Sequence, residues 1–337
     1  MKQLINKKIT GSILIIPPKY IGDAINSIAA TTLLRELYPD NQIILLVKPL
    51  LAPIFERDDR LNLTIMIDQR CNKKKLSSVF SLAKKIRNNN VQMAVIMRSG
   101  FSEALLCSLA KIKYKIGYKK NGRSWLLSHS YKLNSNHHYI NRYCRLVNEP
   151  HNNPFSASPL PYLFSQKSEL IETTSKPVVV VYYGGVIKKQ RHYPSHQALK
   201  SLAYLNEMTP CHFILVGDNQ ETAENNKISK DLYQQQIDHQ DLTGLTSLTE
   251  LVDVIANANL LITIDSGAMH IAAATKTAFA AVVGLGTSPW SIVEPKYQNK
   301  ISLVANGTSL HDAEIITEIT PETVANASAS LLALEDK

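Results

Sequence analysis

Cysteine is scarce in this sequence, and long apolar runs are missing from it. The 337 residues include only four cysteines, and no two of them form a CxxC pair. This spacing argues against a disulfide framework or a cysteine-bound metal cluster, and it favours a reducing compartment. No apolar run reaches the ~18 residues that a membrane-spanning helix needs. The apolar stretch 12–16 leads into Pro17 and Pro18 without a small-residue cleavage site, so we interpret it as a strand and not as a signal peptide.

Two common nucleotide-binding motifs are also absent. Neither GxGxxG nor GxxxxGK[ST] occurs in the chain, which counts against a nicotinamide-dependent oxidoreductase, a function class that we keep as an alternative. The 13 glycines and 15 prolines are ordinary in number and exclude fibrous and low-complexity classes. A hydrophobic content of 45% over this length is enough for two cores of ordinary domain size.

Acidic residues are few in the first half of the chain. Residues 1–165 hold 25 Lys and Arg against nine Asp and Glu, a net charge of +16, whereas residues 166–337 hold 12 against 19, a net charge of −7. Much of the excess lies in 73–75, 84–87 and 111–123. These clusters are either a solvated basic face or a surface for an anionic partner such as an acidic glycolipid, a membrane or nucleic acid. Nucleic acid is the least favoured partner because the chain carries no motif for it.

The apolar pattern alternates between strand and helix in both halves. Proline, asparagine and serine interrupt it over 148–177, where we place the domain boundary. The first half predicts strands at 12–17, 42–47, 61–67, 92–97 and 114–117, and helices at 24–38, 76–88, 103–110 and 138–147. The second half predicts strand segments at 178–185, 211–217, 241–244, 260–264 and 279–283, and helices at 196–207, 221–235, 248–257 and 321–334.

This rhythm predicts an α/β protein with two parallel sheets, each covered by helices. The expected domains are 1–165 and 166–320, followed by a C-terminal helix in 321–337. Two such halves facing one another would leave a cleft between them. Open parallel sheets bind ligands at the carboxyl ends of their strands, so we expect functional residues in the loops that follow the strands.

The segment LLITIDSGAMHIAAA, 260–274, predicts a buried strand, a sharp turn and a helix start. Asp265 and Ser266 are residue types that begin helices, and Gly267 permits close approach of a ligand to the backbone. His270 falls in the first helical turn, where free backbone N–H groups and the helix dipole make an anion site. The alternative for His270 is a purely structural role.

Asp23 follows the first strand, in PKYIGDA, at the edge where ligands bind. A carboxylate there is a candidate general base, and the alternative is that it only caps the helix predicted from Ala24. Lys19 nearby could hold an anion or remain solvated.

Two further loops carry candidate phosphate ligands. Lys188, Lys189 and Arg191 lie in YYGGVIKKQRHYP after one strand and could neutralise a phosphate. Thr287 and Ser288 lie in GLGTSPW after another and could hydrogen-bond to one.

These segments together resemble a known family. ITIDSGAMHIAAA, the N-terminal ILIIPPKYIGDA, MRSGFSEALLCSLAKIKYKIGY, GRSWLL, HHYINRY, KKQRHYP, LVGDNQE and DLTGLTSLTELVDVIANA are similar to segments of the lipopolysaccharide heptosyltransferases, the ADP-heptose-using enzymes of glycosyltransferase family 9. The resemblance covers roughly residues 12–305 and is greater to the second-heptose enzymes (heptosyltransferase II) than to the first.

The resemblance implies a GT-B architecture of two Rossmann-like domains and an inverting, metal-independent glycosyl transfer. The first domain would take the acceptor, a lipopolysaccharide inner core on lipid A, and the second a nucleotide sugar, expected to be ADP-heptose. No cofactor is expected. The enzyme would be cytoplasmic and peripheral, on the anionic cytoplasmic face of the inner membrane, with no nucleic-acid partner.

The resemblance also implies roles for individual residues. Asp23 matches the catalytic base. The donor-binding set is Lys188, Lys189, Arg191, Asp218, Glu221, Asp265, Ser266, Gly267, His270, Thr287 and Ser288. The acceptor-binding set is Lys19, Arg98 and Arg123.

Some positions depart from the family pattern. Arg191 stands where Lys is usual before the aromatic-Pro step, and the acidic position after the strand near Gly217 is shared among Asp218, Asn219 and Glu221. These departures leave two alternatives, a family-9-like transferase that uses a different nucleotide sugar and a sugar-nucleotide-binding protein without transferase activity.

Overall fold

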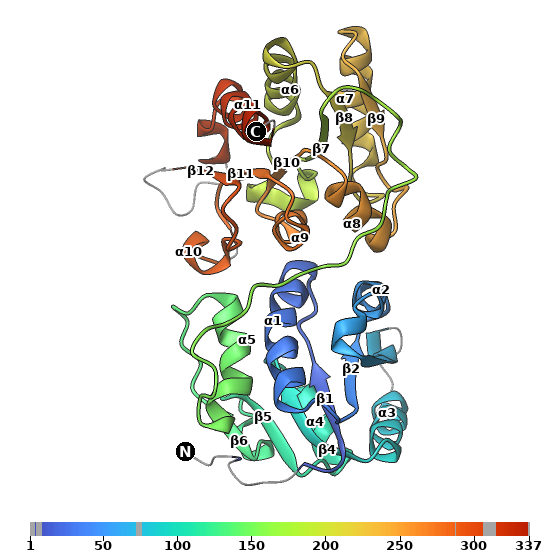
Figure 1. Cartoon of the computed structure of the whole chain (residues 1–337), viewed down its shortest axis with the longest axis vertical. Helices are drawn as coiled ribbons and strands as arrows, with labels where there is room; N and C mark the ends of the chain where they lie inside the picture. The colour runs from blue at the N-terminus through green and yellow to red at the C-terminus, as the bar shows by residue number, and fades with distance from the viewer. Residues whose placement is uncertain (1–3, 5–8, 72–75, 287, 306–314, 336–337) are drawn as a thin grey trace. The chain divides into compact units, whose positions relative to one another are not determined.

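The chain divides into two α/β units, Met1–Phe164 and Ser165–Lys337. A computed structural model describes residues 4, 9–71, 76–286, 288–305 and 315–335. Each unit contains one six-stranded sheet, drawn from blue to green and from green to red in Figure 1. The predicted basic cluster 73–75 and the predicted phosphate ligand Thr287 lie outside the described residues.

The first unit alternates strands with helices. Its strands are β1 Ser12–Ile16, β2 Ile43–Val47, β3 Leu63–Ile67, β4 Val91–Ile96, β5 Tyr114–Tyr118 and β6 His129–Tyr131. Its α-helices are α1 Ile21–Leu37, α2 Ala52–Glu56, α3 Leu76–Asn88, α4 Phe101–Leu109 and α5 Tyr139–Asn148. The first two strands are buried along their whole length, as expected for strands covered on both faces. Helices α3 and α4 contribute to one core with the strands, and α1 packs along α5.

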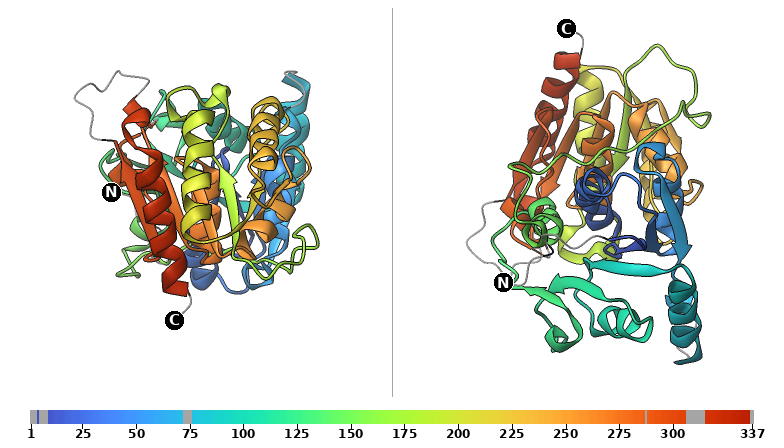
Figure 2. Two further views of the ribbon diagram at one scale, coloured as in Figure 1. Left: turned by 90° about the horizontal axis from the view of Figure 1, so that it is seen from above. Right: turned by 60° about the horizontal axis from the view of Figure 1, so that its bottom comes forward.

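The second unit repeats this plan. Its strands are β7 Val178–Tyr182, β8 His212–Leu215, β9 His239–Asp241, β10 Leu260–Ile264, β11 Phe279–Val283 and β12 Lys300–Val304. Its α-helices are α6 Ser195–Met208, α7 Thr222–Gln234, α8 Leu248–Ala256, α9 Gly267–Thr275, α10 Trp290–Val293 and α11 Pro321–Glu335. Helices α6, α7 and α11 share one apolar core with the sheet. Figure 2 shows α11 beside α6, so the closing helix belongs to this unit.

Both sheets have the same connectivity. The strand orders are β3-β2-β1-β4-β5-β6 and β12-β11-β10-β7-β8-β9, and all neighbouring strands are parallel. In each sheet the strand order therefore reverses between the first and fourth strands of the unit. The reversal point lies between β1 and β4 in the first sheet and between β7 and β10 in the second. Ligands of open parallel sheets bind at the carboxyl ends of the strands at such a reversal. This topology confirms the predicted Rossmann-like fold class.

A few elements differ from the predictions. A short strand with a turn is predicted at 241–244; the strand lies slightly earlier, at His239–Asp241, and the predicted turn follows it, with Gly244 at a φ of +74°. Helix α1 begins at Ile21, three residues before the predicted start. The short elements α2, β6, α10 and β12 were not predicted, since a run of three to five residues carries little periodicity. No helix in the described parts of the chain is long and apolar enough to cross a membrane.

Candidate active site

Arg191 joins the two loops that meet at the reversal point of the second sheet. It lies in the loop after β7, and its Nη1 donates a hydrogen bond of 3.0 Å to the backbone carbonyl of Asp265, directly after β10. Because β7 and β10 are adjacent and parallel, their carboxyl ends lie side by side at one edge of the sheet. The predicted donor residues Arg191 and Asp265 are therefore brought together.

Asp265 occupies a tightly enclosed position. Its exposed fraction is 9%. A methyl group added to Gly286, in the loop after β11, would lie 2.7 Å from the Asp265 Oδ2 atom, so glycine is needed for this approach. Burial raises the pKa of Asp265 above its ordinary value, and the positive charge of Arg191 opposes that rise. Ser288 lies half-buried in the same loop as Gly286.

Ser266 caps the start of α9, as predicted. Its side chain accepts a hydrogen bond of 3.2 Å from the backbone N–H of Ala268. Gly267 is the first helical residue, and His270, with 8% exposure, is the fourth. The backbone N–H groups of this first turn and the positive end of the helix dipole make the start of α9 suited to a phosphate.

Glu221 ties the loop after β8 to the loop after β7. Its carboxylate is buried and accepts hydrogen bonds from the Tyr182 hydroxyl at 2.9 Å, the Gly185 N–H at 3.0 Å and the Asp218 N–H at 2.9 Å. The Lys188 ammonium lies 3.8 Å from the same carboxylate. Glu221 is thus the buried acid among the candidates after β8, and three donors and a cation hold it in place.

Asp218 has a different environment from Glu221. Its side chain is exposed, and Oδ1 accepts a hydrogen bond of 2.8 Å from the N–H of Gln220. This is a local turn contact typical of Asp. The sequence did not decide which of Asp218, Asn219 and Glu221 occupies the acidic position of the family. In the structure only Glu221 is buried among these three.

The backbone of Lys189 is strained. Its φ of +51° and ψ of −126° fall in a region that non-glycine residues rarely adopt, while its side chain is exposed. Such conformations cost energy and are concentrated at ligand-binding sites. The strained residue forms a kink in the short 3-10 segment Val186–Arg191. It lies between Lys188, which contacts Glu221, and Arg191, which contacts Asp265.

In the first unit, Asp23 is the third residue of α1, just after β1. The N-cap is Tyr20, without a side-chain capping bond, so the alternative that Asp23 caps a helix starting at Ala24 is wrong. The Asp23 carboxyl is half-buried. Burial raises the pKa of Tyr143 on α5, and the negative charge of Asp23 raises that pKa further. Lys19, two residues before the helix, is exposed.

Arg98 lies at the reversal point of the first sheet, as Arg191 does in the second. Its Nε donates a 2.6 Å hydrogen bond to the carbonyl of Pro17 after β1, and its Nη1 donates one of 2.9 Å to Asp68 after β3. Arg70 pairs with the same carboxylate at 2.8 Å, and Glu103 lies within 3.8 Å of both arginines. Burial by itself would raise the pKa of Asp68, but the hydrogen bonds and charges of the two arginines outweigh it and lower the pKa to about 2.

Arg123 is also inside the unit. Its guanidinium is fully buried and donates to the backbone carbonyls of Arg98, Gly100 and Tyr118. In both arginines expected to contact the acceptor, Nε and Nη1 therefore bind the protein's own acceptor atoms, whereas Nη2 is buried without a hydrogen-bond partner among the described residues. This is the environment of residues that fix the carboxyl edge of a sheet.

Comparisons with known proteins agree on one family. The family model described as glycosyltransferase family 9 (heptosyltransferase) matches residues 79–311. The chain belongs to glycosyltransferase family 9. Lipooligosaccharide heptosyltransferase 2 of Haemophilus ducreyi is 26% identical over 283 residues, 78% of this chain and 79% of that protein. Lipopolysaccharide heptosyltransferase 2 of Salmonella typhimurium is 24% identical and covers 96% of this chain and 99% of its own.

Solved structures match the fold of this family-9 chain over nearly its full length. The structure of Escherichia coli ADP-heptose lipopolysaccharide heptosyltransferase II has a TM-score of 0.83 and 21% identity, and covers 97% of this chain and 100% of its own. A family 9 glycosyltransferase from Veillonella parvula has a TM-score of 0.85 and 15% identity, with 96% and 98% covered. The match to the family model begins at residue 79 and therefore does not include Asp23. The match to the Salmonella typhimurium relative covers 96% of the chain and includes it.

The sequence did not predict three contacts near the carboxyl edge of the second sheet. They are the hydrogen bond from the Tyr182 hydroxyl to Glu221, the close approach of Gly286 to Asp265, and the contact of 2.9 Å between His192 Nε2 and the Glu224 carboxylate. Each joins residues that are at least 20 positions apart in the sequence. Only the topology of the sheet could have indicated which loops meet.

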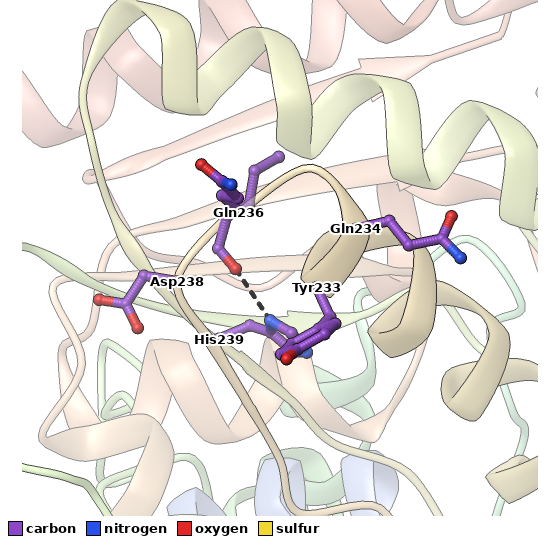
Figure 3. Close-up of a pocket in the computed structure, with 6 residues that line it drawn as sticks. Tyr233, Gln234, Gln236, Asp238 and His239 are labelled. Atoms are coloured by element: carbon purple, nitrogen blue, oxygen red, sulfur yellow. Dashed lines mark hydrogen bonds between the residues drawn. The ribbon is translucent and has the colours of Figure 1, made fainter.

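A separate hollow lies elsewhere on the second unit. It is lined by Tyr233, Gln234, Gln236, Ile237, Asp238 and His239. Figure 3 shows these side chains around the turn between α7 and β9, where His239 Nδ1 and the Ile237 carbonyl lie 2.9 Å apart. The hollow contains none of the predicted site residues and lies at the start of β9, away from the carboxyl ends of the strands.

Proposed function

We propose that this chain transfers a heptose from ADP-heptose to the inner core of lipopolysaccharide, with inversion at the anomeric carbon. The observation that carries the proposal is the cluster after β7 and β10, where Arg191, Asp265 and the start of α9 meet at the reversal point of a parallel sheet. The relatives, which are lipopolysaccharide and lipooligosaccharide heptosyltransferases 2, support the choice of donor and acceptor.

The donor diphosphate would bind at the start of α9. The N–H groups of the first turn of α9 that Ser266 does not accept donate to the phosphate oxygens, and Arg191 and Lys188 offset the negative charge of the diphosphate. Glu221 keeps the loop after β7 in the shape that presents Lys188, since it accepts the Gly185 N–H directly. Lys189, Ser288 and Thr287 complete the proposed donor set, with His270 and Asp218 at its border.

Asp23 acts as the general base of the proposed reaction. Its carboxylate takes the proton of an acceptor hydroxyl as that oxygen bonds to the anomeric carbon. The bond from this carbon to the diphosphate oxygen breaks, and ADP leaves with the electron pair. Because attack and departure occur on opposite faces of the carbon, the configuration inverts. Fixed cations and N–H dipoles stabilise the departing charge, and the proposal includes no metal ion or cofactor.

The acceptor places the enzyme at a membrane surface in this proposal. The first unit, with its net charge of +16, would meet the phosphates and carboxylates of the inner core on the cytoplasmic face of the inner membrane. Lys19, which is exposed beside the start of α1, is a proposed acceptor contact. Nucleic acid is not a proposed partner.

The experiment is a donor and acceptor screen on the purified full chain. ADP release is measured with ADP-heptose, ADP-glucose, UDP-glucose and GDP-mannose, each with and without a one-heptose inner-core acceptor and with and without EDTA. We expect acceptor-dependent release from ADP-heptose alone, unaffected by EDTA. Release from another donor would replace the sugar. Binding of ADP-heptose, seen as a thermal shift, without any release would instead favour a sugar-nucleotide-binding protein.

A further inference from the structure

Two aromatic side chains stand exposed together on the first unit. Trp125, in the 3-10 turn Ser124–Leu126, is 74% exposed, and Phe101, at the start of α4, is 40% exposed. Their ring centroids lie 6.3 Å apart, so they form one apolar surface and not two isolated residues. Large aromatic side chains left in water are costly, and an exposed pair marks a contact surface.

The backbone beneath this pair is fixed from inside the domain. Arg123 is fully buried, and its Nη1 donates to the carbonyl of Gly100, next to Phe101, at 3.0 Å. The Asn121 side chain donates to the carbonyl of Ser99 at 2.9 Å. These bonds join the segment before α4 to the turn that carries Trp125. The rings are therefore presented by a rigid support, which lowers the entropy lost when they bind a surface.

Positive charge adjoins the aromatic pair. Lys119 and Lys120 are exposed in the same turn, and the segment 119–125 contains no acidic residue. Glu103, the acidic residue closest in sequence to Phe101, is buried against Arg98 and Arg70. We call Phe101, Lys119, Lys120 and Trp125 the basic–aromatic patch.

The tip of this turn points into open space. Asn121 and Gly122 both have positive φ, at +54° and +69°, which makes the turn tight. A methyl group added to Gly122 would meet nothing within 4 Å. The turn is therefore open to solvent at Gly122, and no neighbouring side chain there would obstruct a broad partner.

We infer that the basic–aromatic patch docks on an anionic lipid bilayer, with Trp125 and Phe101 entering the headgroup region and the two lysines at the lipid phosphates. Tryptophan favours the membrane–water interface, and lysines near an anionic bilayer are attracted to it. The net charge of +16 on residues 1–165 extends this attraction beyond the patch. This inference rests on the proposed function, because a lipid-linked acceptor is the reason for the enzyme to meet a membrane.

Tryptophan fluorescence tests the inference directly. The chain has only two tryptophans, so Trp290→Phe leaves Trp125 as the sole reporter. Vesicles of phosphatidylcholine alone and vesicles rich in phosphatidylglycerol, each with brominated acyl chains, serve as the probes. We expect a blue shift and quenching of Trp125 with the anionic vesicles only. Vesicle binding without quenching would overturn the inference, as would the same blue shift of Trp125 on adding a delipidated inner-core oligosaccharide or on self-association of the protein without vesicles.

Matched variants distinguish binding through the basic–aromatic patch from a general effect of the positive charge on the first unit. Lys119→Gln and Lys120→Gln are each expected to weaken binding to anionic vesicles roughly fivefold. Lys111→Gln with Lys113→Gln removes two exposed lysines before β5, at the opposite end of that strand, and is expected to weaken binding less. Phe80→Ser, at an exposed aromatic on α3, is the control for Phe101→Ser. Equal losses in patch and control variants would contradict the inference.

Turnover then distinguishes failure of the inference from failure of the proposed function. Trp125→Ser with Phe101→Ser is expected to keep transfer to a delipidated acceptor and to lose it at least several-fold for an acceptor embedded in anionic vesicles. Undiminished transfer to the embedded acceptor would overturn the docking surface alone. If the unmodified chain transfers no sugar to either acceptor, the proposed function fails, and the fluorescence measurement still decides the docking surface.

Discussion

Arg191 bonds to the backbone of Asp265, not to its carboxylate: Nη1 lies 3.0 Å from the Asp265 carbonyl oxygen. The bond crosses the reversal point of the second sheet, between the loops after β7 and β10. In the first sheet, Arg98 makes the equivalent contact with the carbonyl of Pro17. Each unit thus uses one arginine to fix the two loops from which its proposed functional residues come.

Replacing Arg191 by lysine tests whether the fork of the guanidinium matters. Lysine keeps the charge but has no fork of donors with which to hold the Asp265 carbonyl and a phosphate together. We expect Arg191→Lys to raise the KM for the donor about tenfold and Arg191→Met to raise it further, because it also removes the charge. Steady-state kinetics with ADP-heptose measure both. A wild-type KM in Arg191→Met would remove Arg191 from the donor site.

Asp265→Asn is expected to separate stability from donor binding. The pKa of this carboxyl is raised, so its favourable contribution to stability exists below the pKa of the unfolded chain and is lost as the pH rises through the folded value. At neutral pH the buried charge therefore destabilises the fold, and asparagine of the same shape should leave the Tm unchanged or higher.

The same substitution should weaken donor binding and lower turnover if Asp265 contacts the donor. Thermal denaturation from pH 3 to 8 and calorimetric titration with ADP-heptose check the two expectations. A clear loss of Tm at neutral pH together with unchanged donor affinity would show that Asp265 is a structural residue only.

Lys189 offers a test of backbone strain with two variants. Glycine adopts a φ of +51° readily, whereas alanine meets the same steric clash as lysine. We expect Lys189→Gly to have an unfolding free energy about 1–2 kcal/mol higher than Lys189→Ala, and both to bind the donor more weakly than the unmodified chain, because both lack the cation. Denaturant unfolding and titration with donor measure the two effects. Equal stability of the two variants would mean that the turn relaxes without strain.

Asp68 predicts how the first unit responds to acid. Its pKa falls from 3.8 to about 2 in the fold, so the stability that it contributes is present above pH ~4 and is lost as the pH falls toward 2. At neutral pH, Asp68→Asn should cost roughly 2–4 kcal/mol, because Arg70 and Arg98 lose their shared carboxylate.

Asp58→Asn is the matched control, since Asp58 makes a pair of the same spacing and distances with the half-exposed Arg60. It should cost less. Urea unfolding across this pH range measures the difference, which should shrink for Asp68→Asn below pH 4. A pH-independent difference would contradict the ionic origin of the stabilisation.

Much of the fold could be predicted from local pattern. The strand Leu260–Ile264 and the helix Leu76–Asn88 were predicted to the residue, because an unbroken apolar run and a regular helical spacing are both local signals. Ser266 as a cap followed from its residue type. Two edge strands were missed for different reasons: β6 has only three residues, and β12 is only partly buried and lacks a continuous apolar run.

The site was less predictable, since it depends on contacts between distant segments. Arg98 and Arg123 were predicted to bind the acceptor because they lie in motifs that match the family. They are 25 residues apart, and no local sequence signal shows that they belong to the same buried hydrogen-bond network. The environment of Glu221 likewise depends on Tyr182, 39 residues earlier. Motif position predicted the candidate residues, but their contacts depend on how the sheet brings distant segments together.

Asp23→Asn is the decisive variant for the proposed role of Asp23 as the general base. Asparagine keeps the size and polarity of the side chain but cannot take a proton, so we expect turnover to fall about 10²–10⁴-fold with unchanged affinity for ADP-heptose. Glu36→Gln, at an exposed acid on the far end of α1, should keep wild-type turnover. Single-turnover transfer with both substrates saturating makes the measurement. Near wild-type transfer by Asp23→Asn would show that Asp23 is not the base and would contradict the account.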